Sequence, residues 1–152
     1  MTPAGKRNPN TIFLSTSRVS PEKTATEIQE LLSRRAKRVI SEYDGGEVVA
    51  ISFSMVLDGN EILFRLPVRW QAYFKVLERQ HRRNPRSRGE VKEDQARRTA
   101  WRVAKAWMEA QLALIDSGMV ELQEVMLPYI VQPGGETLYE RAARTGFLLE
   151  HK

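Results

Sequence analysis

The sequence of 152 residues contains no cysteine and only two histidines, His81 and His151. The absence of cysteine excludes a disulfide framework, a thiolate-zinc site, an iron-sulfur cluster and a cysteine nucleophile, and it is compatible with the reducing cytosol. His81 belongs to an arginine-rich segment and His151 is the penultimate residue. Neither histidine lies where packing would hold an imidazole rigidly for catalysis, so we expect no catalytic residues and no enzyme.

Long apolar runs and nucleotide-binding glycine motifs are also missing. The longest stretch without a charged residue is about eleven residues, against roughly 20 for a membrane-spanning helix, and the polar start of the chain does not resemble a signal peptide. Gly45-Gly46 and Gly134-Gly135 are turn glycines, because neither pair precedes a helix with a Lys-Ser/Thr or a GxGxxG pattern. We expect a cytoplasmic protein without a membrane contact and without a cofactor.

Metal binding would have to use carboxylates alone. Asp58 and Glu61 lie in or beside a predicted hairpin turn, which explains them without a metal ion. Glu109 follows Lys105 and Arg102 on one face of a predicted helix, as in an intrahelical ion pair. No metal site is expected, and a carboxylate-metal nuclease remains only a third functional alternative.

Positive charge is concentrated in one part of the chain. Twenty-four basic and nineteen acidic residues give a net charge of +5 and a sequence pI of 9.7. Residues 75–105 contain eleven basic and four acidic residues, a net charge of +7, so the remaining 121 residues carry a net charge of −2. Such a local field attracts polyanions, including nucleic acids and phosphorylated ligands.

Turn residues and hydrophobic periodicity predict one α+β domain over residues 11–152, preceded by a flexible tail at residues 1–10. A helix should begin after Ser20 as N-cap and continue to about Arg35. Three strands are expected over residues 38–43, 48–57 and 61–68, joined by Asp-Gly turns into an antiparallel β-meander. One face of this meander is apolar and the other mixed, so helices should cover one side only.

The second half of the chain predicts one long central helix with smaller helices around it. Residues 70–80 fit a short amphipathic helix, residues 90–117 the long helix, and residues 137–144 a last small helix, with a strand-like run at 129–131. The long helix is apolar over roughly two thirds of its circumference. It either runs between the sheet and other helices or forms an oligomer interface. We favour a homo-oligomer, because a small domain rarely covers two opposite helix faces alone.

Two groups of basic residues are candidate phosphate contacts. Residues 81–89 contain four arginines and no aliphatic side chain, and are predicted to form an exposed arginine loop, while a second group forms a polar stripe on the long helix. Arginine matches phosphate oxygens with a planar fork of donors. Aromatic residues before the loop either belong to the core or stack on bases. The candidate phosphate contacts are Arg79, Arg82, Arg83, Arg86, Arg88, Arg98, Arg102 and Lys105, and the possible stacking residues are Trp70, Tyr73 and Phe74.

The C-terminal part of the chain contains a residue pattern that resembles the pattern of a known protein family. It consists of Trp101-Arg102, Ala110, Leu112, Asp116-Ser117-Gly118, Glu124, Leu127-Pro128-Tyr129-Ile130-Val131 and Pro133-x-Gly135-x-Thr137-x-Tyr139. Over about the last fifty residues the chain thus resembles a family of small, uncharacterised proteins of bacteriophages, prophages and other mobile elements. The resemblance implies a genomic setting more than a mechanism.

The hypothesis that unites these observations is a non-enzymatic nucleic-acid-binding accessory protein of a phage or mobile element, with DNA or RNA as its partner. The alternative is a phage anti-defence protein that sequesters a nucleotide signal or blocks a host defence protein. Its nucleotide pocket would be built from Arg98 and Arg102 at a subunit interface. A host or mobile-element protein is a further possible partner.

Overall fold

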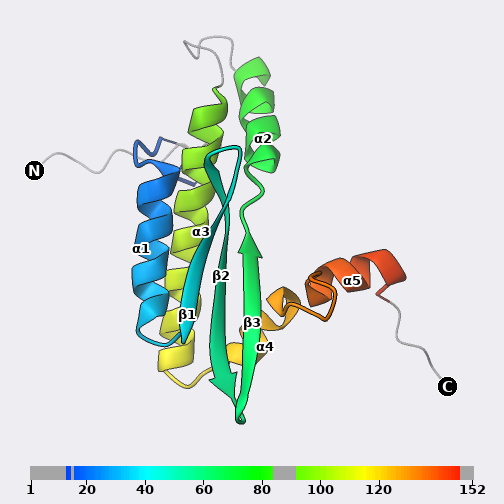
Figure 1. Ribbon diagram of the computed structural model, residues 1–152. Coiled ribbons are helices and arrows are strands. Elements are labelled where there is room, and N and C mark those ends of the chain that lie inside the picture. The colour runs from blue at the N-terminus through cyan, green and yellow to red at the C-terminus, as the bar shows by residue number, and fades with distance from the viewer. Residues whose placement is uncertain (1–12, 15, 84–91, 148–152) are drawn as a thin grey trace, which may run out of the picture.

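The computed structural model describes residues 13, 14, 16–83 and 92–147 (Figure 1). These residues form a three-stranded antiparallel sheet and five α-helices, including one long helix, so the α+β prediction is confirmed. In chain order the elements are α1 (Pro21–Ser33), β1 (Arg38–Asp44), β2 (Glu47–Leu57), β3 (Asn60–Pro67), α2 (Trp70–Arg83), α3 (Glu93–Asp116), α4 (Leu122–Met126), the 3-10 helix η1 (Leu127–Tyr129) and α5 (Leu138–Thr145). The predicted tail at residues 1–10 lies outside the described residues.

The sheet is the predicted meander, with strand order β1-β2-β3 and both pairs antiparallel. Phe53 on the central strand lies opposite Val39 on one side and Phe64 on the other. The second turn places Asp58 at φ 51° and Gly59 at φ 80°. A tight two-residue hairpin with the right-handed strand twist requires positive φ at both central residues, and Asp-Gly adopts this geometry at low cost.

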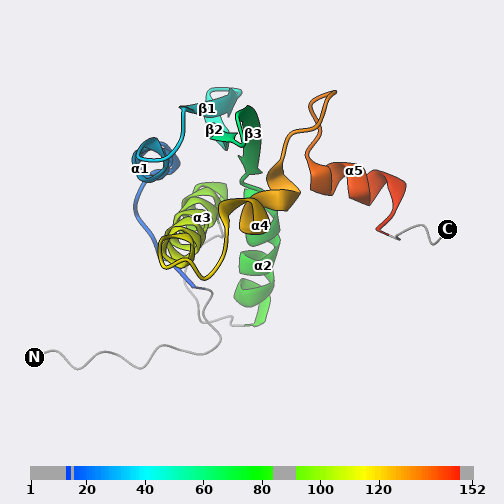
Figure 2. The same ribbon diagram turned by 90° about the horizontal axis from the view of Figure 1, so that it is seen from below.

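One face of the sheet is packed against helices, as Figure 2 shows from below. The core contains the stacked rings of Phe53 and Phe64, whose centroids are 5.1 Å apart, together with Ile28 of α1 and Trp101 of α3. Each such side chain contributes about 1.5–3 kcal/mol by leaving water. On the opposite face Ile40 is exposed. The prediction of a sheet covered on one side is therefore confirmed.

The long helix α3 runs between α1 and α2 (Figures 1 and 2) and turns Trp101, Met108 and Leu112 into the core. Near its N-terminus, Gln95 and Arg98 both donate hydrogen bonds to the carbonyl of Ser17, which ties the segment before α1 to α3. The apolar circumference of α3 thus meets several elements of its own chain. This agrees with the alternative in which the long helix runs between the sheet and other helices. A homo-oligomer stays a prediction.

The structure corrects two predictions, the end of one helix and the strand-like run at residues 129–131. The sequence predicts a helix over residues 70–80 followed by an arginine loop. For residues 81–83 this prediction is wrong, because α2 continues to Arg83. Arginine is a good helix former, and cations near a helix C-terminus interact favourably with the helix dipole. The rest of the predicted loop, with Arg86 and Arg88, lies outside the described residues. The strand-like run at 129–131 forms only isolated bridges, Phe64 to Ile130 and Val131 to Thr137.

Candidate nucleic-acid interface

The exposed face of α2 carries four basic side chains, Lys75, Arg79, Arg82 and Arg83. At 100° per residue they fall within an arc of about 100°. The opposite face of the helix holds most of its apolar residues, of which Trp70 and Tyr73 pack against the core. Packing of the apolar face therefore orients the four cations toward solvent.

No acidic side chain among the described residues neutralises this face. None of the four cations forms an ion pair or hydrogen bond there, and each has an exposed side chain. Glu78 is the only acidic residue of α2, so four basic residues minus one acidic residue leave this helix with a net charge of +3. We call this group the basic face of α2; it consists of Lys75, Arg79, Arg82 and Arg83.

The basic stripe of α3 is engaged within the molecule. Arg102 Nη1 and Lys105 Nζ lie 2.5 and 3.0 Å from Glu27 Oε2 on α1, and Lys105 is also 3.3 Å from Glu109. Hydrogen bonding from Lys105, followed by that from Arg102, lowers the pKa of Glu27, and the hydrogen bond to Glu27 raises the pKa of Lys105. A phosphate at this stripe would have to displace a carboxylate that already binds both cations.

Arg98, the first residue of the same stripe, is also occupied. Its Nη2 donates to Gln95 Oε1 at 2.8 Å and its Nε to the carbonyl of Ser17 at 3.3 Å. The structure thus brings Arg98, Arg102 and Lys105 against α1 and the segment before it, rather than leaving them open. Sequence reasoning missed Glu27, because a partner 75 residues away leaves no local spacing signal.

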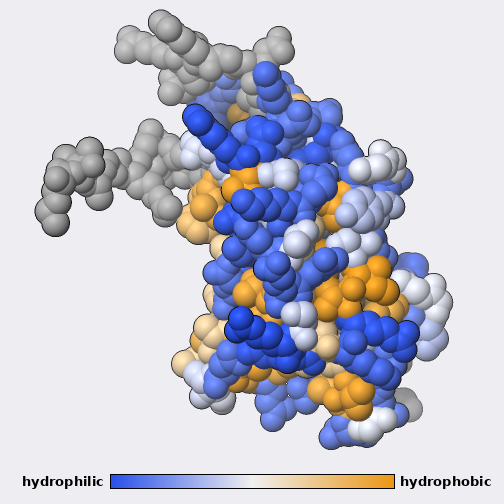
Figure 3. All heavy atoms as spheres, turned by 60° about the vertical axis from the view of Figure 1, so that its left-hand side comes forward, coloured by the Kyte–Doolittle hydropathy of each residue, from blue (hydrophilic) through white to orange (hydrophobic). Residues whose placement is uncertain are grey.

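Three basic residues at and just after the end of α1 are also paired with carboxylates. Arg35 forms an ion pair with Asp116 at the end of α3. Lys37 and Arg38 both lie 3.1 Å from carboxylate oxygens of Glu61. A hydrogen bond from Ser54 is the largest of the effects that lower the pKa of Glu61. Figure 3, which brings the α1 side forward, shows hydrophilic residues over much of this face, interrupted by smaller hydrophobic areas.

The carboxylates considered for metal binding have other roles. Asp58 is a turn residue, Glu61 accepts from Ser54 and Lys37, and Glu109 pairs with Lys105 one helical turn away, as the sequence predicts. Within the described parts of the chain, no three side chains of His, Cys, Asp or Glu are grouped as a metal would require.

The three possible stacking residues differ in their surroundings. The guanidinium carbon of Arg97 lies 4.4 Å from the ring centroid of Trp70, so a cation already occupies one face of that indole. Phe74 meets Trp70 edge-on with centroids 6.4 Å apart. Tyr73 instead lines a groove between α2 and α3. Burial raises the pKa of the Tyr73 hydroxyl.

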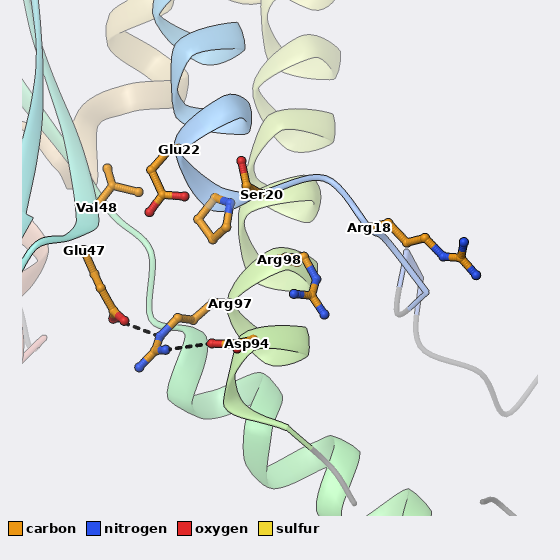
Figure 4. Close-up of a pocket in the computed structure, with 9 residues that line it drawn as sticks. Arg18, Ser20, Glu22, Glu47, Val48, Asp94, Arg97 and Arg98 are labelled. Atoms are coloured by element: carbon orange, nitrogen blue, oxygen red, sulfur yellow. Dashed lines mark hydrogen bonds and ion pairs between the residues drawn. The ribbon is translucent and has the colours of Figure 1, made fainter. Parts of the chain in front are cut away.

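A small cleft of about 210 Å³ lies beside the N-terminus of α1 (Figure 4). Its lining includes three arginines and three acidic residues. Arg97 Nε is 3.0 Å from Glu47 Oε2, although its N–H is not directed along that line, and Arg97 Nη1 donates to Asp94 at 3.2 Å. Because the acidic residues balance the arginines, this cleft does not favour an anionic ligand. The charged lining residues are Arg18, Arg97, Arg98, Glu22, Glu47 and Asp94.

Among the helices of the described residues, none combines the length and the apolarity needed to cross a bilayer. Comparison of the chain with protein-family models, with curated proteins and with solved structures finds no match.

Proposed function

We propose that the protein is a non-enzymatic nucleic-acid-binding accessory protein of a phage or mobile element, acting in the cytoplasm. The supporting observation is the basic face of α2, where Lys75, Arg79, Arg82 and Arg83 are exposed and have no ionic partner among the described residues. Cations fixed along one helix face at a spacing of three or four residues can contact successive phosphates of a polyanion.

The contacts should be largely independent of sequence. Arginine and lysine contacts to phosphates fix the position of a nucleic acid but carry no sequence information directly. Arg98, Arg102 and Lys105 are assigned a structural role, because Glu27 and the Ser17 carbonyl already bind them. For the same reason, the geometry favours this function over a nucleotide pocket built on Arg98 and Arg102.

Fluorescence anisotropy with labelled single-stranded and duplex DNA and RNA tests the proposal. If four cations contact phosphates, the affinity for a single strand should fall roughly 50-fold between about 50 and 200 mM salt, and that for a duplex somewhat more. Binding that is undetectable at the lower salt concentration would overturn the proposal.

A matched pair of charge-reversal variants distinguishes binding by the basic face from an effect of the net charge of the protein alone. The triple variant Arg79→Glu, Arg82→Glu, Arg83→Glu should abolish binding at about 50 mM salt. The control triple Lys23→Glu, Arg34→Glu, Arg141→Glu changes the net charge equally, at exposed side chains that form no ion pair within 4 Å in the described residues. It should retain most of the affinity. Equal losses in both triples would refute a localised interface.

A further inference from the structure

An aromatic groove of about 320 Å³ lies between α2, α3, the end of β3 and η1. Its walls include Tyr73 of α2, Trp107 of α3 and Tyr129 of η1, its floor includes Leu66, and Arg69 lies at its rim. The volume is at the lower end of the range of about 300–1,000 Å³ for small-molecule sites. The groove is therefore suited to one planar group rather than to a large ligand.

The three aromatic residues of the groove are only half-buried. The rings of Trp107 and Tyr129 meet edge-on, with centroids 5.7 Å apart and an interplanar angle of 66°. The Tyr73 and Tyr129 hydroxyls and the Trp107 indole N–H form no hydrogen bond among the described residues, and each of these atoms keeps some contact with solvent. The groove thus offers ring surface together with polar atoms that remain open to a ligand.

The groove and the basic face of α2 belong to the same helix. On the helical wheel Val76, which is 37% exposed, lies between Tyr73 and the Lys75–Arg79 side of α2. Arg69, one residue before α2, is exposed beside the groove and forms no ion pair in the described residues. A ligand with its planar group in the groove would place attached anionic groups near these cations.

We propose that this groove binds an unstacked base of a single-stranded nucleic acid, whose phosphates contact Arg69 and the basic face of α2. This inference rests on the proposed function and adds its substrate class. Bases in a duplex are stacked and paired, so a groove between side chains can take them only after they are extruded. Aromatic side chains beside a positively charged track are the combination that binds single strands with little sequence preference.

The test compares a labelled oligothymidylate of about twelve nucleotides with an abasic oligonucleotide of equal length, which keeps the phosphates and lacks the bases. The protein should bind the oligothymidylate at least about tenfold more tightly. Tyr73→Leu keeps an apolar side chain without a ring and should bring the two affinities together, whereas Tyr73→Phe should preserve the difference. The salt dependence should be the same in all three proteins.

The outcomes separate this inference from the proposed function. If the protein binds neither oligonucleotide at about 50 mM salt, this inference fails, and the anisotropy titration with duplex DNA and with RNA decides whether the proposed function fails with it. If it binds both equally, the basic face binds phosphates but the groove takes no base. If Tyr73→Leu keeps the full preference for thymidylate, the groove assignment is wrong. If light scattering shows a dimer that Tyr73→Leu dissociates, the groove belongs to a second copy of the chain instead.

Discussion

Glu27 is the residue through which the ion pairs between α1 and α3 converge. One carboxylate oxygen accepts from Arg102 and Lys105 together, and the side chain is 27% exposed. Two cations that share one anion would repel each other without it. Glu27 therefore both joins two helices and compensates the positive stripe of α3.

Removing the charge of Glu27 should destabilise the protein in a pH-dependent way. Because the folded state lowers its pKa, Glu27 contributes stability above its unfolded pKa of about 4.3, and loses that contribution as the pH falls through the folded value. At pH 7 the variant Glu27→Gln should be less stable by about 1–2 kcal/mol, since partial exposure weakens the pairs. The difference from the parent should shrink below about pH 4.3.

Urea unfolding at neutral and acidic pH measures this effect. Glu30→Gln is the matched control, because Glu30 is exposed on the same helix and its carboxylate forms no ion pair in the described residues. That control should change the free energy of unfolding by no more than about 0.5 kcal/mol. A loss for Glu27→Gln that persists unchanged at acidic pH would show that its carboxylate charge is not the stabilising feature.

At the scale of elements, predictions succeeded where the signal was local. Asp58-Gly59 between β-branched and aromatic runs predicts a hairpin, and the positive φ of both residues confirms it. The sequence does not reveal the end of α2, because the segment after Gln80 lacks aliphatic residues and its composition predicts a loop. His81 is half-buried, while Arg82 and Arg83 extend the exposed side. Helical geometry can continue where hydrophobic periodicity no longer marks it.

α5 should depend strongly on its cap, because none of its residues is buried. Thr137 Oγ1 accepts from the Glu140 N–H at 3.2 Å, and the Thr137 N–H in turn donates to Glu140 Oε2 at 3.1 Å. Thr137 itself is 2% exposed. Thr137→Ala should therefore destabilise this helix by about 1 kcal/mol, which corresponds to about a fivefold loss of protection from hydrogen exchange.

Hydrogen exchange followed by mass spectrometry can locate this loss. Peptides that cover Leu138–Thr145 should exchange faster in Thr137→Ala, while those of α3 should be unchanged. Thr137→Ser keeps the capping hydroxyl and should behave like the parent. Faster exchange throughout the chain would mean that α5 unfolds only together with the whole domain.

At the scale of the whole molecule, the sequence locates the basic region but not which of its charges are free. Residues 75–105 carry a net charge of +7, yet Glu27 of α1 binds Arg102 and Lys105 at the far end of that region. Such pairing is a tertiary contact, which the spacing of residues along the sequence cannot reveal. The groove cannot be predicted from the sequence either, because Tyr73, Trp107 and Tyr129 meet only when α2, α3 and η1 pack together.

Ligand binding should stabilise the entire folded body, because α2 packs on α3 and the groove uses three elements of that body. A ligand that binds only the folded state at about 100 times its Kd adds about 2.7 kcal/mol. For a chain of this length the Tm should rise by about 5–10 °C. Calorimetry at low salt with oligothymidylate measures this rise, which the Arg79→Glu, Arg82→Glu, Arg83→Glu triple should lack. If that triple shows the same rise, the nucleic acid binds elsewhere. If the parent binds oligothymidylate but its Tm does not change, α2 is not thermodynamically coupled to the core.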